Sequence, residues 1–233
     1  MHIKENYLMN KKGKLIFIIA AVVLGSIAIS VVDGIIKPEY VLKSAAKIAV
    51  FPLLPALYFL IFKDERQHLR SMFRPTKKAL ALAAALGVGV FTVVMSAFFL
   101  LRSFIDFSSF TNNLTSTAGI SRENFIFVSA YICILNSFWE ELFFRAFAFL
   151  SFKRHAGRKP AYVFSSLLFA LYHTGMTAIW FAPWQFLIML LGLFIGGIVF
   201  CFVDEKTESV FPSYLCHFFA NLATTSIGFI LLS

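Results

Sequence analysis

Seven long apolar runs, separated by short charged segments, constrain this chain more than any other feature. The runs cover roughly residues 15–32, 45–62, 79–101, 125–150, 161–182, 184–203 and 210–232. A helix needs about 20 apolar residues to cross the hydrocarbon core of a bilayer. The sequence therefore predicts an all-α fold, namely a polytopic helical membrane protein with about seven transmembrane helices.

Composition excludes the main alternatives. Hydrophobic residues make up 59% of the chain and charged residues 14%, whereas a soluble domain carries about 25% charged residues. The 30 phenylalanines exclude a disordered chain, because so much apolar surface has to be buried or placed in lipid. The net charge of +9 is spread over short clusters between the apolar runs, whereas a nucleic-acid-binding surface gathers its charge on one face. We therefore expect the lipid bilayer as the partner of this chain, and we expect no nucleic-acid partner.

The basic residues predict the orientation of the chain. Four lysines precede the first run, and segments 63–78 and 153–159 hold six and four basic residues, whereas 33–44 and 102–124 hold two each. Lysine and arginine gather on the cytoplasmic side of a membrane protein. We therefore expect an integral protein, of a bacterial cell membrane by its composition, with its N-terminus in the cytoplasm and its C-terminus outside. Segment 102–124 is expected to be a solvated outer loop, with a lid as the alternative.

Two adjacent acids, Glu140 and Glu141, lie inside the fourth run, whereas every other Asp and Glu is expected in a tail or loop. A charge at that depth costs at least about 2.5–3.5 kcal/mol, so both acids need partners or water. Arg145 follows Glu141 by four residues, which places the two on one helical face and predicts an ion pair. Glu140 is rotated by about 100° from its neighbour, so it needs a different partner.

Candidate partners for Glu140 lie in two other runs. His173 is near the middle of the fifth run, and His217 and Asn221 are one helical turn apart in the seventh. At about 1.5 Å per residue, all three fall at a depth similar to that of Glu140. Each alone is commonly an interhelical hydrogen bond. Their shared depth instead predicts a polar mid-membrane cavity, open toward the cytoplasm.

Such a cluster suits hydrolysis of a peptide bond. Glu140 can act as general base toward a water molecule, and His173 can hold that water or ligate a metal. His217 and Asn221 offer donors for the oxyanion of the tetrahedral intermediate. Alternatively, Glu140 with the two histidines forms a three-ligand set for a catalytic zinc, although no HExxH signature is present. The three cysteines lie in apolar runs without CxxC spacing, which predicts neither a disulfide nor a thiol-ligated metal.

Three short motifs carry a family resemblance. In chain order they are Glu140-Glu141-x-x-x-Arg145, Phe169-x-x-x-His173 and His217-x-x-x-Asn221. They resemble the motifs of the CAAX-protease and bacteriocin-processing (CPBP, or Abi) intramembrane endopeptidases, which are related to the type II CAAX prenyl endopeptidases. The resemblance covers residues 125–225, so we expect a catalytic helical core there. Residues 1–124 are then helices without motifs, and 226–233 the end of the last span.

The resemblance implies roles for these residues. Glu140 would activate water, with Glu141 and Arg145 in support, and His173 would be a ligand of water or metal. His217 with Asn221 would stabilise the transition state. The implied substrate is a membrane-associated or leader peptide, or a prenylated or lipidated protein. The family also leaves open an acyl transferase of lipoprotein N-acylation and a non-catalytic bacteriocin immunity or scaffold protein.

Overall fold

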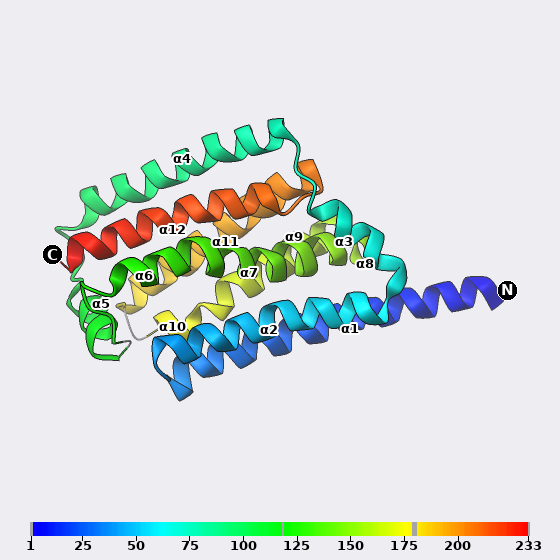
Figure 1. Ribbon diagram of the computed structural model, residues 1–233, viewed down its shortest axis with the longest axis horizontal. Helices are drawn as coiled ribbons and strands as arrows, with labels where there is room; N and C mark the ends of the chain where they lie inside the picture. Colours follow the sequence, from blue (N-terminus) through cyan, green and yellow to red (C-terminus); the bar gives the residue numbers. More distant parts are fainter. Residues whose placement is uncertain (1, 118, 179–180, 233) are drawn as a thin grey trace.

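A computed structural model describes residues 2–117, 119–178 and 181–232, and these form a bundle of helices without any strand (Figure 1). The elements are α1 (His2–Val31), η1 (Val32–Ile36), α2 (Tyr40–Ile61), η2 (Lys63–Glu65), α3 (Arg66–Met72), α4 (Lys77–Leu101), α5 (Ser108–Asn112), η3 (Asn113–Thr117), α6 (Phe125–Ala130), η4 (Tyr131–Asn136), α7 (Ser137–Glu141), η5 (Leu142–Ser151), α8 (Phe152–Ala156), α9 (Arg158–Tyr172), α10 (Thr174–Thr177), α11 (Pro183–Thr207) and α12 (Phe211–Leu231). The all-α fold is thereby confirmed.

Six helical runs of the described chain are long and apolar enough to cross a membrane. They are Asn10–Ile36, Tyr40–Ile61, Lys77–Leu101, Phe125–Ala156, Pro183–Thr207 and Phe211–Leu231. Each of them overlaps one of the expected spans, and their outward faces carry large aliphatic side chains such as Leu82, Val93 and Leu187. The chain is therefore an integral membrane protein.

The fifth expected span, 161–182, is not one continuous helix. α9 has 15 residues, and the short α10 follows after His173. Gly175 in α10 lies against the backbone of Ser30 in α1, where a Cβ would overlap it, so α10 and α1 approach closely at this point. Residues 179–180 of the expected span lie outside the described residues. The polar residues His173, Thr174 and Thr177 follow this helix end, but the span was placed by the average hydropathy of a long run, which does not locate the end of a helix.

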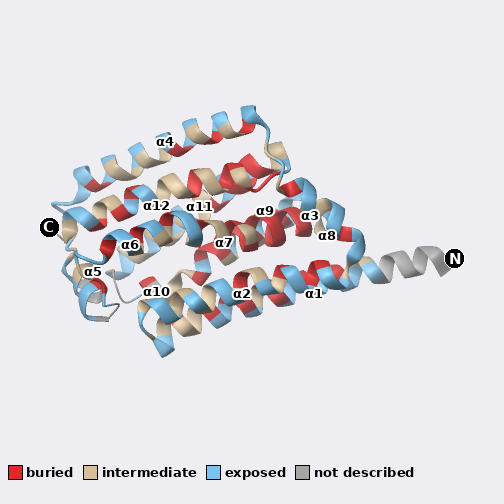
Figure 2. Cartoon of the chain, viewed as in Figure 1, coloured by how far each residue is buried: buried red, intermediate tan, exposed pale blue. Residues whose placement is uncertain are grey.

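The segment that carries the motifs occupies the centre of the bundle. Figure 2 shows buried residues concentrated along α7 and α9, whereas α4 at the edge is largely exposed. Every residue from Phe143 to Ser151 in η5 is buried. α9 packs against η5 and α11, and α12 lies along α4. Gly197 of α11 fits against Ser166 of α9 with no room for a side chain, so these two helices approach closely.

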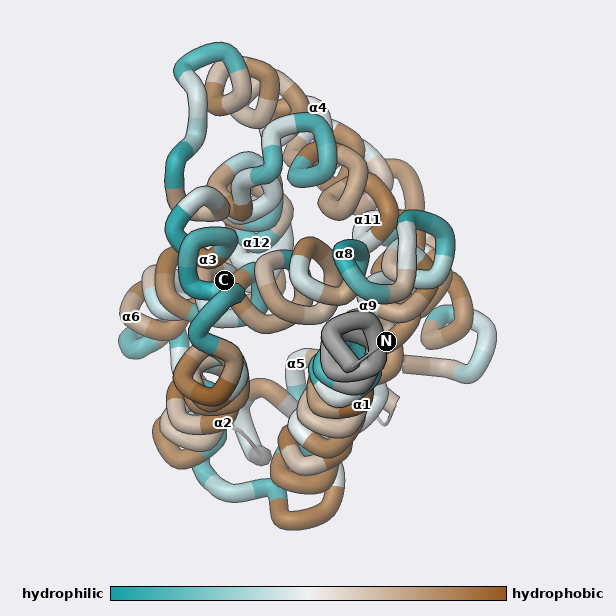
Figure 3. Tube along the Cα trace, turned by 90° about the vertical axis from the view of Figure 1, so that its right-hand side faces the viewer, coloured by the Kyte–Doolittle hydropathy of each residue, from teal (hydrophilic) through white to brown (hydrophobic). Residues whose placement is uncertain are grey.

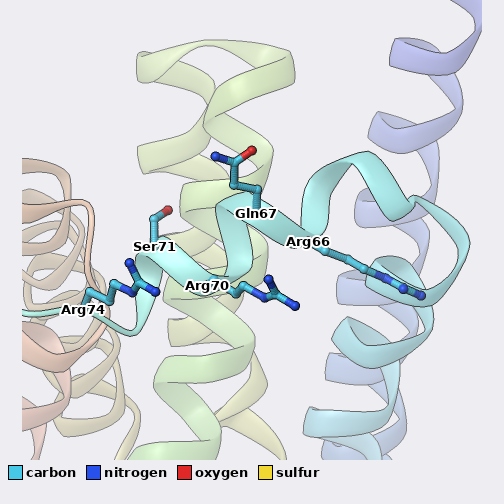
Figure 4. Close-up of a pocket in the computed structure, with 5 residues that line it drawn as sticks. All are labelled: Arg66, Gln67, Arg70, Ser71 and Arg74. Carbon is cyan, nitrogen blue, oxygen red and sulfur yellow. The ribbon is translucent and has the colours of Figure 1, made fainter.

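Charged residues gather at one end of the bundle. In Figure 3 that end faces the viewer, and α3 and α8 are the hydrophilic segments there. Ion pairs join Lys153 to Glu208 at 2.6 Å and Arg158 to Glu205 at 2.9 Å. Figure 4 shows a group of exposed residues on α3 and two residues beyond its end, namely Arg66, Gln67, Arg70, Ser71 and Arg74. Among the described residues, no Asp or Glu forms an ion pair with the three arginines of this group. The two chain termini lie at opposite ends of the bundle (Figure 1).

The expectation that all acids other than Glu140 and Glu141 lie in tails or loops is wrong. Asp204 is fully buried in α11, where its carboxylate accepts hydrogen bonds from the backbone and hydroxyl of Ser213 at 3.0 and 2.7 Å. Asp33 is also buried, within η1 at the end of the first span. Both acids lie at the ends of apolar runs, and a hydropathy pattern does not say which end residues face inward.

Candidate functional site

Four of the six predicted site residues line one cavity of about 380 Å³. They come from α7, the end of α9 and α12, and are Glu140, His173, His217 and Asn221. Most of the remaining wall is apolar, with contributions from Phe125, Met189 and Leu193. The shared cavity that the sequence predicts is therefore present. Glu141 and Arg145 do not line it, and both are fully buried behind it.

The cavity extends toward the end of the bundle opposite the basic residues. Its wall includes Tyr40 and Lys43 from the first turn of α2, and Phe110 from α5. These elements lie at the end far from α3 and α8 (Figure 1). The cavity therefore does not extend toward the basic end, which is the end that the sequence predicts to be cytoplasmic. Depth was counted along ideal helices, which locates a residue along the bundle but does not say toward which end a cavity extends.

Segment 102–124 covers this end of the cavity. Leu114 and Ile120 are buried, form a cluster with Phe125 and line the cavity wall. Most described residues of this segment are exposed, in keeping with the predicted solvated loop, while Leu114 and Ile120 also cover the cavity, as the alternative of a lid requires. The sequence does not show which apolar residues of this segment face inward, since Leu114 and Ile120 are buried whereas Phe104 is exposed.

The two carboxylate oxygens of Glu140 have different surroundings. Oε1 accepts hydrogen bonds from the Asn136 amide at 2.6 Å and from the Tyr172 hydroxyl. Oε2 is buried and has no hydrogen-bond partner among the described residues. The sequence reasoning missed both partners. Asn136 precedes Glu140 by four residues, a spacing that could have indicated it, whereas nothing distinguished Tyr172 from other aromatic residues.

His217 lies between the two acids. Its Nδ1 is 2.8 Å from Glu141 Oε1, and its Nε2 is 3.7 Å from Glu140 Oε2. Because a carboxylate can only accept, Nδ1–H donates to Glu141. This bond fixes the orientation of the imidazole and leaves Nε2 on the side of Glu140.

The predicted pair of Glu141 and Arg145 is found in the structure. Glu141 Oε2 is 3.3 Å from Arg145 Nε, and both side chains have 0% exposure. The guanidinium group also stacks on aromatic rings, at 4.2 Å from the ring centre of Phe169 and 5.1 Å from that of Phe200. Arg145 thus lies outside the cavity wall, and it is connected to the cavity only through Glu141 and His217.

His173 and Asn221 differ in what they can offer to a ligand. His173 Nδ1 donates to the carbonyl of Phe169 at 2.7 Å, so the lone pair of a neutral ring is on Nε2. The Asn221 amide nitrogen donates to Ser137 Oγ at 2.8 Å and to the Ile132 carbonyl at 3.3 Å. Both of its N–H bonds are therefore engaged, and the predicted oxyanion donor is already used within the protein.

The residues proposed as zinc ligands do not converge into a metal-binding group. Within the described part of the chain, no three His, Cys, Asp or Glu side chains lie close enough to hold a metal ion together. The zinc alternative stays a prediction.

The helix that carries the two acids is irregular on both sides of them. α7 has only five residues, and π-helical turns η4 and η5 flank it. The hydroxyl of Ser137 donates to the Ile132 carbonyl five residues earlier, at 3.0 Å. Such π-turns are frequent at functional sites, because they rotate the side chains that follow them.

Comparison with known proteins gives a family match. The family model described as type II CAAX prenyl endopeptidase Rce1-like matches residues 122–223. That segment includes all six predicted site residues, together with Asn136 and Tyr172. No curated protein matches the chain, and no solved structure does.

Proposed function

Residues 122–223 belong to the Rce1-like, type II CAAX prenyl endopeptidase family, and from this premise we propose that the protein hydrolyses peptide bonds within the membrane by means of a water molecule activated by Glu140. One observation carries the proposal. The buried Oε2 of Glu140 has no hydrogen-bond partner among the described residues, in a cavity that it shares with two imidazoles. A buried polar atom without a partner is costly, so it indicates a missing ligand such as water.

In the proposed reaction, the attacking water donates one hydrogen bond to Glu140 Oε2 and one to His173 Nε2. Its oxygen attacks the peptide carbonyl while Glu140 takes the proton, and a tetrahedral intermediate forms. The C–N bond then breaks as Glu140 returns the proton to the leaving amine. Asn136 and Tyr172 hold Oε1, which keeps Oε2 directed toward the water.

We assign stabilisation of the oxyanion to His217. When His217 is protonated, its Nε2–H can donate a hydrogen bond to the developing negative charge, while its Nδ1–H still donates to Glu141. Glu141 balances the charge of the imidazolium, and Arg145 in turn neutralises Glu141. Asn221 becomes a positioning residue in this scheme, because its amide group holds Ser137 and the Ile132 carbonyl.

We expect hydrolysis to survive removal of metal ions, because the scheme uses only side chains and water. Purified protein incubated with 1,10-phenanthroline, then dialysed, should keep most of its initial rate. Loss of more than nine tenths of the rate, restored by added zinc, would instead support the ligand set of Glu140, His173 and His217.

The proposed substrate is a lipidated, prenylated or otherwise membrane-associated peptide, because the cavity wall is largely apolar and lies within the bundle. Intact-mass spectrometry of membrane proteins from cells with and without the gene tests this. Peptide hydrolysis predicts substrates that are shorter in cells with active protein. A gain of one acyl chain without shortening would favour lipoprotein N-acylation, and a phenotype that survives Glu140→Gln would favour an immunity or scaffold role.

We further propose that the basic end faces the cytoplasm and that the C-terminus is outside. The three native cysteines are buried, so they give little background in a labelling experiment. Gln67→Cys on α3 and Glu123→Cys before α6 place thiols at exposed positions at opposite ends. A membrane-impermeant maleimide should label the second variant in intact cells and the first only after permeabilisation. The reverse pattern would refute the proposed orientation.

A further inference from the structure

The segment around α3 carries an excess of positive charge. Residues 63–78 include six basic residues and only two acids, Asp64 and Glu65. Both acids bind the ammonium group of Lys14 in α1, and Glu65 also pairs with Arg154 of α8 at 3.3 Å. These acids are therefore neutralised by cations from outside the segment, so they do not offset the charge of its arginines.

The arginines of α3 are presented on a rigid support. Met72 is buried, and the partly buried Leu69 and Phe73 pack against the main hydrophobic core. The amide of Val210 donates to the Met72 carbonyl at 3.0 Å, which fixes the end of α3 to the start of α12. One face of this short helix is thus anchored to the bundle, while the other face, which carries Arg70, is exposed.

The five residues drawn in Figure 4 line one open depression of about 470 Å³. Arg66 is fixed in its wall, because its Nε donates to the carbonyl of Phe59 near the end of α2 at 2.8 Å. Arg70 and Arg74, by contrast, have neither an ion pair nor a side-chain hydrogen bond within the part of the chain that the structure describes. Two guanidinium groups are therefore available to a ligand. A guanidinium group matches the oxygens of a phosphate bidentately.

The depression lies at the membrane surface. α3 joins α2 to α4, and both of these helices are long and apolar enough to cross a bilayer, so the short segment between them lies where lipid meets water. Apolar surface adjoins the depression, since Leu60 and Ile61 at the end of α2 are each 58% exposed and Arg66 Nη2 is 3.5 Å from the Leu60 carbonyl. A phospholipid matches both features, because its phosphate is attached to acyl chains. A soluble anion would use only the charge.

We propose that the depression on α3 binds the headgroup of an anionic phospholipid, with Arg70 and Arg74 as ligands of its phosphate. The acyl chains of this lipid lie along the exposed end of α2. Ser71 adds a second contact, because its hydroxyl donates to the His68 carbonyl at 2.7 Å and its oxygen remains an acceptor. A headgroup with free hydroxyls, such as that of phosphatidylglycerol, can donate to this oxygen. The site lies outside the catalytic cavity and does not depend on the proposed hydrolysis.

Lipid binding can be measured by native mass spectrometry of the full chain in a non-ionic detergent. The probes are dioleoyl phosphatidylglycerol and dioleoyl phosphatidylcholine, which have the same acyl chains and differ in net charge. An arginine near an anionic lipid surface contributes about fivefold in affinity, so we expect phosphatidylglycerol to bind at least tenfold more tightly. Arg70→Gln combined with Arg74→Gln should remove this preference without weakening phosphatidylcholine. Arg70→Lys combined with Arg74→Lys should keep only part of it, because an ammonium group cannot bind phosphate bidentately.

Lys77→Gln combined with Lys78→Gln is the matched control. It removes the same charge from exposed positions of the same segment, and neither lysine lines the depression. Binding of phosphatidylglycerol to this variant should stay within threefold of wild type. An equal loss in both glutamine double variants would assign the preference to diffuse charge and overturn the site, as would equal binding of the two lipids to wild type. Displacement of the lipid by inorganic phosphate or hexaglutamate at the same concentration would assign the arginines to soluble anions and likewise overturn the inference.

Discussion

Glu140→Gln should lower the rate of peptide hydrolysis by about a thousandfold, within the range expected for loss of a general base. The glutamine oxygen can still accept from Asn136 and Tyr172, so the local hydrogen bonds of Oε1 are kept. The amide NH₂ that replaces Oε2 cannot take a proton from water. The measurement is the initial rate at equal protein concentration, together with the thermal unfolding midpoint in detergent.

Glu39→Gln is the matched control for this variant. Glu39 is exposed just before α2 and lies outside the cavity wall, so the same change of charge should leave the rate within twofold of wild type. A folded Glu140→Gln protein that keeps more than a tenth of the wild-type rate would contradict the role assigned to Glu140.

Arg145→Ala should cause the largest loss of stability of any single substitution in the site. It leaves Glu141 buried without its cation, and breaking a buried ion pair costs about 3–5 kcal/mol. It also opens a void beside the rings of Phe169 and Phe200, on which the guanidinium group stacks. We expect a lower yield of monodisperse protein, a lower unfolding midpoint and reduced activity.

Two further variants separate charge from volume. Arg74→Ala removes an exposed arginine that has no acid partner in the described part of the chain, and it should be close to neutral. The double variant Glu141→Gln with Arg145→Met leaves no charge from this pair in the core, so it should recover part of the lost stability. An Arg145→Ala protein as stable as wild type would show that the buried pair does not hold the core together.

Helix geometry explains what the sequence could predict. The spans follow from the length of the apolar runs. The Glu141–Arg145 pair was predicted from the four-residue spacing of a regular helix, and it forms even though Arg145 lies in the π-helical η5. The meeting of Glu140 with His173, His217 and Asn221 in one cavity followed from similar depth in three helices. These features depend on local helix geometry or on position along the bundle axis, and both can be worked out by counting residues along the sequence.

Features that depend on tertiary contacts cannot be predicted by counting residues along the sequence. Just beyond the end of α9 at Tyr172, Gly175 meets Ser30 on another helix, a contact that the sequence does not reveal. The rotation of each helix decides that Tyr172 donates to Glu140 and that Asn221 donates inward to Ser137. The cavity wall at this end depends on which residues of segment 102–124 turn inward, and these are Leu114 and Ile120.

Hydrolysis in isotopically labelled water tests the central claim most directly. Purified protein would be incubated with a cleavable lipidated peptide in H₂¹⁸O, and the products analysed by mass spectrometry. Attack by water activated at Glu140 predicts one ¹⁸O atom in the new carboxylate of the wild-type product, and no labelled product from Glu140→Gln. An unlabelled carboxylate, an acylated peptide of full length, or the same labelled product from both proteins would contradict it.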